Sequence, residues 1–183
     1  MPLNKPRPLQ LVFEEKKGAA ASLAVTVALA LDSGGRLSAR FEVSGQPSRV
    51  NAALPTDGPQ WGLWDWDVVE LFVAASKEPT YHEFQVSPLG QHFELEIFEP
   101  RKRFNRDFRS GFTHSATRTA DDRWSAQLAI DLSKLGWTGE RADVRGNAFA
   151  ILGAPGAKTY WSLSTPPQAK PDFHLPEHFK PLC

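Results

Sequence analysis

Apolar residues occupy every second position along much of the chain, which is the spacing of β-strands with one buried face. The first such run, residues 23–31, alternates larger and smaller side chains and is followed by Asp32-Ser33-Gly34-Gly35. A second alternating run covers residues 37–43. Two period-two runs on either side of a glycine-containing turn predict a β-hairpin.

Further short runs predict strands at 68–73, 81–86, 91–98, 113–117, 124–130, 149–152 and 159–163. Residues 131–136 predict a single helical turn, capped by Asp131 and closed by Gly136. No amphipathic helix of useful length is predicted, so the fold class is all-β, an antiparallel sandwich or barrel. The proline-rich segment 165–183 is predicted to wrap along it as ordered, non-repetitive chain.

Length and composition restrict the possible classes of protein. The 183 residues are 41% hydrophobic and 23% charged, which predicts one globular domain over residues 1–183. Lys and Arg number 21 and Asp and Glu number 21, so the net charge is zero. This balance predicts no nucleic-acid partner and no anionic membrane partner, and it leaves the oligomeric state open. No run approaches the roughly 20 continuous apolar residues of a membrane helix.

The compartment is judged from two features. The lone cysteine is Cys183, so no intramolecular disulfide is possible. Residues 19–31 resemble the apolar part of a signal peptide, but Glu14 and Glu15 precede them where basic residues are usual. We therefore interpret this run as a strand and favour a cytoplasmic location, with export left open.

Two motifs resemble known functional sequence patterns. "HLPEH", from His174 to His178, matches an inverted zinc-protease pattern, but Pro176 disfavours the helix that it needs by ~3 kcal/mol. "RKRFNRDFR", residues 101–109, has five basic residues interleaved with two phenylalanines. It is typical of a phosphate-binding patch or of a solvated loop with its aromatics under the sheet, and zero net charge favours the loop. Nucleotide-binding, hydrolase-elbow and Cys-X-X-Cys motifs are absent from the sequence.

Three segments together resemble a known family. They are "LWDWDVVELFV", "EFQVSPLGQ" and the terminal "YWSLS…KPDFHLPEHF", with a W-x-x-D-x-V-E signature from Trp64 to Glu70 and F-H-x-P-x-x-F from Phe173 to Phe179. They resemble family 9 carbohydrate-binding modules and related DOMON-like proteins. The resemblance implies a two-sheet antiparallel β-sandwich that binds a saccharide, by preference a chain end, without catalysis.

The resemblance also implies the ligand-binding residues. Trp64 matches the first of two aromatic rings that enclose a sugar, and Glu70 matches an acidic group that binds hydroxyls. Gln85 stands where the family has an arginine, while Phe173 or His174 would supply the second ring. Trp161, on the last predicted strand, is included as a ligand-binding residue, with burial as the alternative. Trp61 and Trp66 are interpreted as structural. No pair of carboxylates is assigned as acid and nucleophile, so the expectation is a protein that is not an enzyme.

Cofactors are the last question that the resemblance raises. Calcium is implied only by the family, because no Asp- or Asn-rich loop is visible. Haem ligation by Met and His is improbable because the only methionine is Met1. His82 and His92 flank one predicted hairpin, which leaves a bis-histidine haem site as a less favoured alternative. A scaffold that has lost its sugar site is the other alternative.

Overall fold

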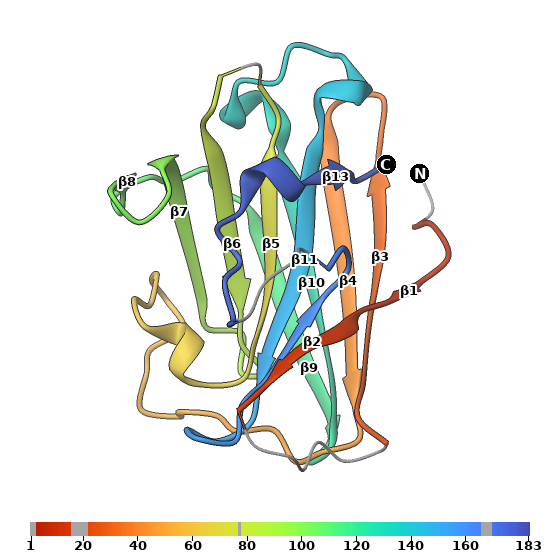
Figure 1. Cartoon of the computed structure of the whole chain (residues 1–183), viewed down its shortest axis with the longest axis vertical. Helices are drawn as coiled ribbons and strands as arrows, with labels where there is room; N and C mark the ends of the chain where they lie inside the picture. Colours follow the sequence, from red (N-terminus) through yellow and green to blue (C-terminus); the bar gives the residue numbers. More distant parts are fainter. Residues whose placement is uncertain (1–2, 16–21, 77, 166–169) are drawn as a thin grey trace.

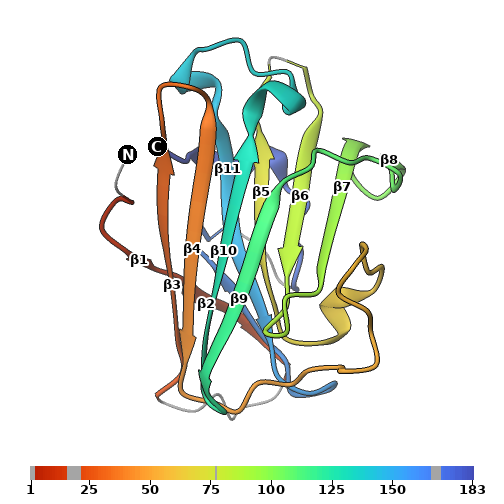
Figure 2. The same ribbon diagram turned by 180° about the vertical axis from the view of Figure 1, so that it is seen from behind.

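Two antiparallel sheets lie face to face in the computed structural model, which describes residues 3–15, 22–76, 78–165 and 170–183 (Figures 1 and 2). The smaller sheet has the order β1 (Arg7–Pro8), β3 (Ala24–Leu31), β4 (Arg36–Ser44), β10 (Arg123–Asp131), β9 (Thr113–Ala120). The larger sheet has the order β2 (Gln10–Glu14), β12 (Thr159–Ser162), β11 (Arg145–Leu152), β5 (Val68–Ala74), β6 (Tyr81–Val86), β7 (His92–Glu99), β8 (Arg103–Asn105). A further strand, β13 (Lys180–Pro181), pairs with β11. The predicted all-β, two-sheet antiparallel sandwich is confirmed.

The main core lies between the two sheets. On β10 the alternation predicted from sequence turns Trp124, Ala126, Leu128 and Ile130 inward, and each of them is at most 2% exposed. The pairing of β3 with β4 from Leu31↔Leu37 onward confirms the predicted hairpin. Apolar burial of this extent is the dominant favourable contribution to folding.

The larger sheet is apolar on its outer face as well. Side chains on this face form a second cluster: Phe72, Tyr81, Phe93, Leu95, Ile97, Phe149 and Ile151, with Phe173 and Phe179 from the C-terminal segment. All six residues of β6 are buried. A strand covered on both faces need not alternate, which explains the nearly continuous apolar sequence of β5.

The C-terminal segment crosses this outer face, as predicted for a proline-rich wrap (Figure 1). It contains a short 3₁₀ turn, η4 (Pro176–His178), and ends with Phe179 and Leu182 buried. Gly146 on β11 allows the close approach, because a Cβ there would overlap the carbonyl oxygen of Phe72 and lie 2.9 Å from Leu182 Cδ1.

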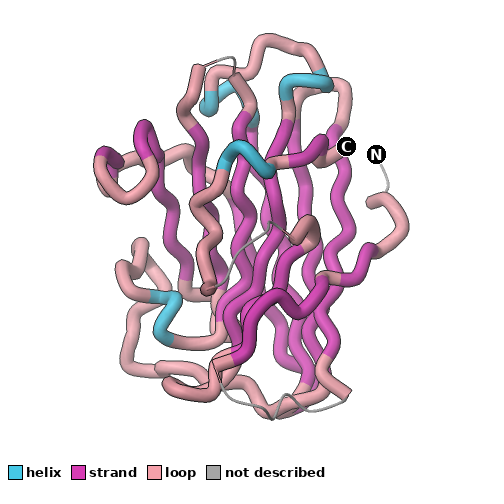
Figure 3. Tube along the Cα trace, viewed as in Figure 1, coloured by secondary structure: helices cyan, strands magenta, loops and turns pink. Residues whose placement is uncertain are grey.

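Helical structure is limited to four short 3₁₀ turns among the described residues (Figure 3). They are η1 (Leu63–Asp65), η2 (Leu132–Leu135), η3 (Arg141–Asp143) and η4. The turn η2 confirms the predicted cap, since the Asp131 side chain accepts a hydrogen bond from Ser133 N and Gly136 has φ 80°. No described helix has the length and apolar character needed to cross a membrane.

Four strands were not predicted: β1, β2, β8 and β13. The first two are nearly continuous in the chain, yet β1 pairs with β3 and β2 pairs with β12, so the N-terminal segment joins the two sheets. Met1, Ala19–Ala21 and residues 166–169 of the predicted wrap lie outside the described residues.

Candidate functional site

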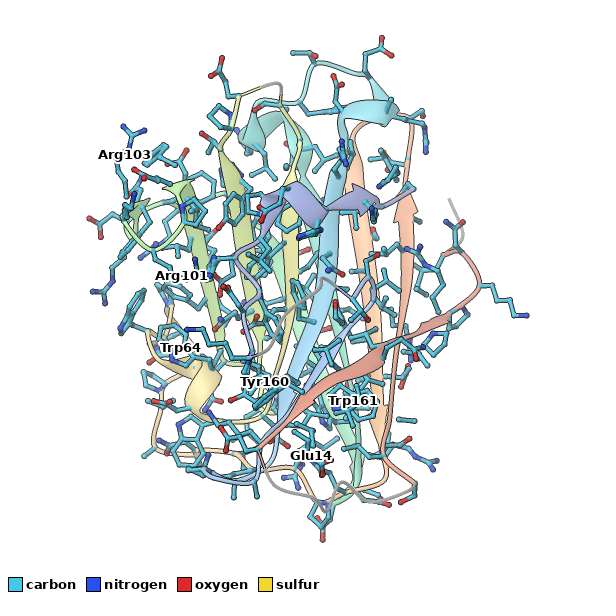
Figure 4. The ribbon with its side chains drawn as sticks, viewed as in Figure 1. Glu14, Trp64, Arg101, Arg103, Tyr160 and Trp161 are labelled. Carbon is cyan, nitrogen blue, oxygen red and sulfur yellow. The ribbon has the colours of Figure 1, made fainter. Side chains whose placement is uncertain are left out.

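A cavity of about 710 Å³ opens on the outer face of the larger sheet. Its floor comes from β5, β6, β7 and β11, and its walls come from residues 61–64, 101–104 and 170–174. Figure 4 labels Trp64, Arg101 and Tyr160, three of the residues that line it. Segments far apart in sequence therefore meet at one place on the sheet.

Three polar side chains form the floor. Glu70 on β5 lies directly opposite Gln85 on β6, and Glu83 lies two residues before Gln85 on the same face of that strand. Gln85 Nε2 donates hydrogen bonds to Glu70 Oε1 at 2.9 Å and to Glu83 Oε1 at 2.5 Å. Glu70 is 2% exposed, Glu83 4% and Gln85 1%.

The two carboxyl groups are costly to ionise in this position. Burial, together with the neighbouring Glu83 carboxylate, raises the pKa of Glu70 well above its ordinary value. Burial raises the pKa of Glu83 to about 7, against the opposing effect of its hydrogen bond from Gln85. Lys158 lowers the pKa of Glu70, but its Nζ donates to the carbonyl oxygen of Trp64 at 2.9 Å. The pair of carboxyl groups therefore tends to hold a proton near neutral pH.

The Gln85 carbonyl oxygen has no hydrogen-bond partner although it is buried. Gln85 donates its two amide hydrogens to Glu70 and Glu83. In this orientation of the amide, Oε1 faces away from the two carboxyl groups. An unpaired buried polar atom costs roughly 1–3 kcal/mol. A hydrogen-bond donor on a ligand in the cavity would remove that cost.

Aromatic side chains form the rim. Trp61 is 45% exposed and meets Trp64 edge to face, with their ring centroids 4.8 Å apart. Phe104 stacks with Trp61 at 6.2 Å, and the Arg106 guanidinium lies 3.7 Å from the centroid of the same indole. The turn that presents these rings depends on Gly62, whose φ is 85°. Trp61, interpreted from the sequence as structural, is thus largely exposed and lines the cavity.

The C-terminal segment closes one side of the cavity. Phe173 stacks on Phe149 at 3.9 Å, and His174 Nδ1 lies 2.9 Å from the Tyr81 hydroxyl. His174 Nε2 is 3.7 Å from Glu83 Oε2. Burial lowers the pKa of His174 to about 4, so the ring is neutral in this setting.

Five of the six residues predicted for the site line this cavity: Trp64, Glu70, Gln85, Phe173 and His174. Trp161 does not, because its ring packs into the core between the sheets, where Nε1 donates to Thr159 Oγ1 at 2.9 Å. Sequence reasoning missed Glu83, which the alternation of β6 places on the same face as Gln85. It also missed Arg101 and Phe104, which lie in the predicted basic loop.

The histidines do not converge as the haem alternative requires. The register of β6 and β7 places His82 opposite Glu96 and His92 opposite Val86, at opposite ends of the hairpin. His92 instead stacks with His114, with ring centroids 4.1 Å apart. Within residues 3–15, 22–76, 78–165 and 170–183, no three His, Cys, Asp or Glu side chains gather as metal ligands. The zinc pattern from His174 to His178 therefore lacks such a ligand set in the part of the chain that the structure describes.

The basic residues at 101–109 make contacts within the chain. Arg101 forms an ion pair with Asp172, and Lys102 forms one with Glu99 at 2.6 Å. Arg103 lies over Phe98, Arg106 lies over Trp61, and Arg109 donates to backbone carbonyls. Phe108 packs against the main core, while Phe104 faces the cavity. The segment thus contains the short strand β8, where a loop was predicted, and it makes mostly internal contacts with one aromatic residue at the site.

Comparison of the sequence with known proteins finds relatives but no matching family model. The chain is 30% identical over 135 residues to the UPF0462 protein C4orf33 homolog of Danio rerio, covering 70% of this chain and 64% of that protein. It is 31% identical over 125 residues to UPF0462 protein C4orf33 of Homo sapiens, covering 64% and 59%. The similarity thus spans less than two thirds of the length of these relatives.

Comparison of the structure finds solved structures of similar fold. A crystal structure of a candidate carbohydrate-binding protein from Bacteroides uniformis matches with a TM-score of 0.76 and 16% identity, covering 96% of this chain and 84% of that one. A carbohydrate binding module family 9 from Caldicellulosiruptor kristjanssonii, in complex with cellotriose, matches with a TM-score of 0.60 and 11% identity, covering 97% and 77%. At these identities the likeness establishes the fold.

Proposed function

We propose that the cavity on the outer face of the larger sheet binds a saccharide. The observation that carries the proposal is the unpaired Gln85 Oε1 at a polar floor, beneath a rim that includes the exposed indole of Trp61. A pyranose ring needs both elements, because its C–H faces pack on aromatic rings and its hydroxyls need directional partners. The solved structures of similar fold, one of them holding cellotriose, support the same ligand class.

The proposal includes binding without catalysis. In a glycoside hydrolase the scissile bond must lie between two carboxyl groups, one acid and one nucleophile or base. Here the Gln85 amide nitrogen lies between Glu70 and Glu83 and donates to both, so a glycosidic bond has no room between them. Incubation with oligosaccharides should release no new reducing ends. Their steady release would contradict this part of the proposal.

Calorimetric titration with cello-, xylo- and other oligosaccharides tests the binding itself. Trp61→Ala and Trp64→Ala should each weaken binding by about tenfold or more, because aromatic anchors at a rim carry a large share of binding energy. Trp66→Ala is the matched control: it removes an indole from the same segment, where the ring lies under the Arg49 guanidinium and does not line the cavity. Failure of every saccharide to bind would favour the alternative of a scaffold that has lost its sugar site.

A further inference from the structure

When Glu70 and Glu83 are ionised, the floor of the cavity offers a ligand acceptors and no donors. The two amide hydrogens of Gln85 are already donated to Glu70 and Glu83. What remains is Gln85 Oε1, which has no partner, and the second oxygen of each carboxylate. A ligand group that reaches this floor must therefore be a donor, and several hydrogens are better than one.

Ionisation of these two carboxyl groups gives the floor negative charge that no bonded cation offsets. Among the described residues, no lysine or arginine donates a hydrogen bond to Glu70 or Glu83. The nearby cations are engaged elsewhere: Lys158 bonds to the Trp64 carbonyl oxygen, and Arg101 pairs with Asp172. Lys170 lies at the exposed edge of the cavity, and His174 contacts the Tyr81 hydroxyl through Nδ1 while its Nε2 lies 3.7 Å from Glu83 Oε2.

We propose, resting on the saccharide-binding function above, that the ligand is an amino sugar whose ammonium group lies at the floor, where it donates to Gln85 Oε1 and to the free oxygens of Glu70 and Glu83. An ammonium group has three hydrogens for these three acceptors, and its positive charge favours the ionised form of the two carboxyl groups. A hydroxyl brings one hydrogen and no charge. An acetamide brings one hydrogen together with a carbonyl oxygen that would face further acceptors.

Three trisaccharides with the same β-1,4 linkage test this directly in the intact protein. They consist of glucosamine, glucose or N-acetylglucosamine units, and differ only in the ammonium, hydroxyl or acetamide at C2. Calorimetry at a pH where the amine is protonated should show the glucosamine trisaccharide binding about tenfold tighter than the other two, as expected for charge-assisted hydrogen bonds. Stronger binding of cellotriose or of the acetylated trisaccharide would overturn the amino-sugar inference and leave the saccharide proposal intact. No binding of any of the three would overturn both.

Two variants show whether the preference comes from the floor. Glu83→Gln keeps the shape of the side chain and removes its charge, so the tenfold preference for glucosamine should largely disappear. Gln127→Met, on the exposed face of β10 in the other sheet, is a control that should leave the preference unchanged. An unchanged preference in folded Glu83→Gln protein would also overturn the inference. If that variant does not fold, the inference is tested by the affinities of the three trisaccharides for the wild-type protein.

Discussion

Removing the charge at Glu83 should stabilise the protein at alkaline pH while weakening its site. Glu83 is 4% exposed on β6, and its carboxylate receives a hydrogen bond from Gln85 Nε2. Glutamine has the same shape, retains an acceptor for that bond and cannot ionise. The variant Glu83→Gln therefore isolates the cost of holding a buried negative charge in the floor.

The size and the sign of the effect follow from the pKa. In the folded protein burial raises the pKa of Glu83 from its ordinary 4.5 to about 7. The folded state thus binds this proton more tightly than the unfolded chain, so the stabilisation is full below 4.5 and is lost as the pH rises through 7. A shift of this size corresponds to about 3 kcal/mol at higher pH. Wild type and variant should therefore have similar stability near pH 4 and differ by up to about 3 kcal/mol near pH 8.

Urea unfolding followed by tryptophan fluorescence, repeated across this pH range, measures the difference. The control is Glu42→Gln, which changes an exposed glutamate in an ion pair with Arg40 on β4. Its stability should stay within about 0.5 kcal/mol of the wild type at each pH. If the Glu83→Gln and wild-type curves run parallel from acid to base, Glu83 is not the costly charge that its burial implies.

Two further predictions concern the sandwich itself. Gly146→Ala should destabilise the protein by roughly 2 kcal/mol or more in urea unfolding, because the new Cβ would overlap the Phe72 carbonyl, whereas Gly58→Ala, with open space around it, should have little effect. Burial lowers the pKa of His82 from 6.5 to about 4, so the folded state prefers the neutral ring and stability is lost as the pH falls from 6.5 towards 4. His82→Phe, which keeps a ring beside Phe108, should retain about 3 kcal/mol more of its stability at pH 4 than the wild type does, measured by the same urea titration.

The strands could be predicted wherever one face is buried and the other is not. The alternation from Trp124 to Ile130 is an example, and the structure has β10 at Arg123–Asp131. Strands of two residues such as β13 gave no signal, because a pairing that short contains no period. The division into one domain stays a prediction.

The site was predicted less completely, for a physical reason. Trp64, Glu70 and Gln85 were found through motifs, whereas Trp61 was missed because no periodicity tells an exposed indole from a buried one in a loop. Trp161 was included among the site residues with burial as the alternative, and the structure places its ring in the core between the sheets. Which face a residue takes on an isolated short strand depends on register, and register is set by partners distant in sequence.

The location of the cavity follows from how the outer face of the larger sheet is covered. This face is apolar enough to need a cover, and the C-terminal segment supplies one through Phe173 and Phe179. This segment covers only part of the face. The cavity lies at the edge of the covered part, beside His174. There β5 and β6 carry Glu70 and Gln85 instead of the apolar residues that would pack best. Buried polar groups that are only partly satisfied reduce stability, and natural proteins retain such groups mainly at functional sites. The residues that reduce the stability of this part of the sheet are therefore the ones that we expect to bind the ligand.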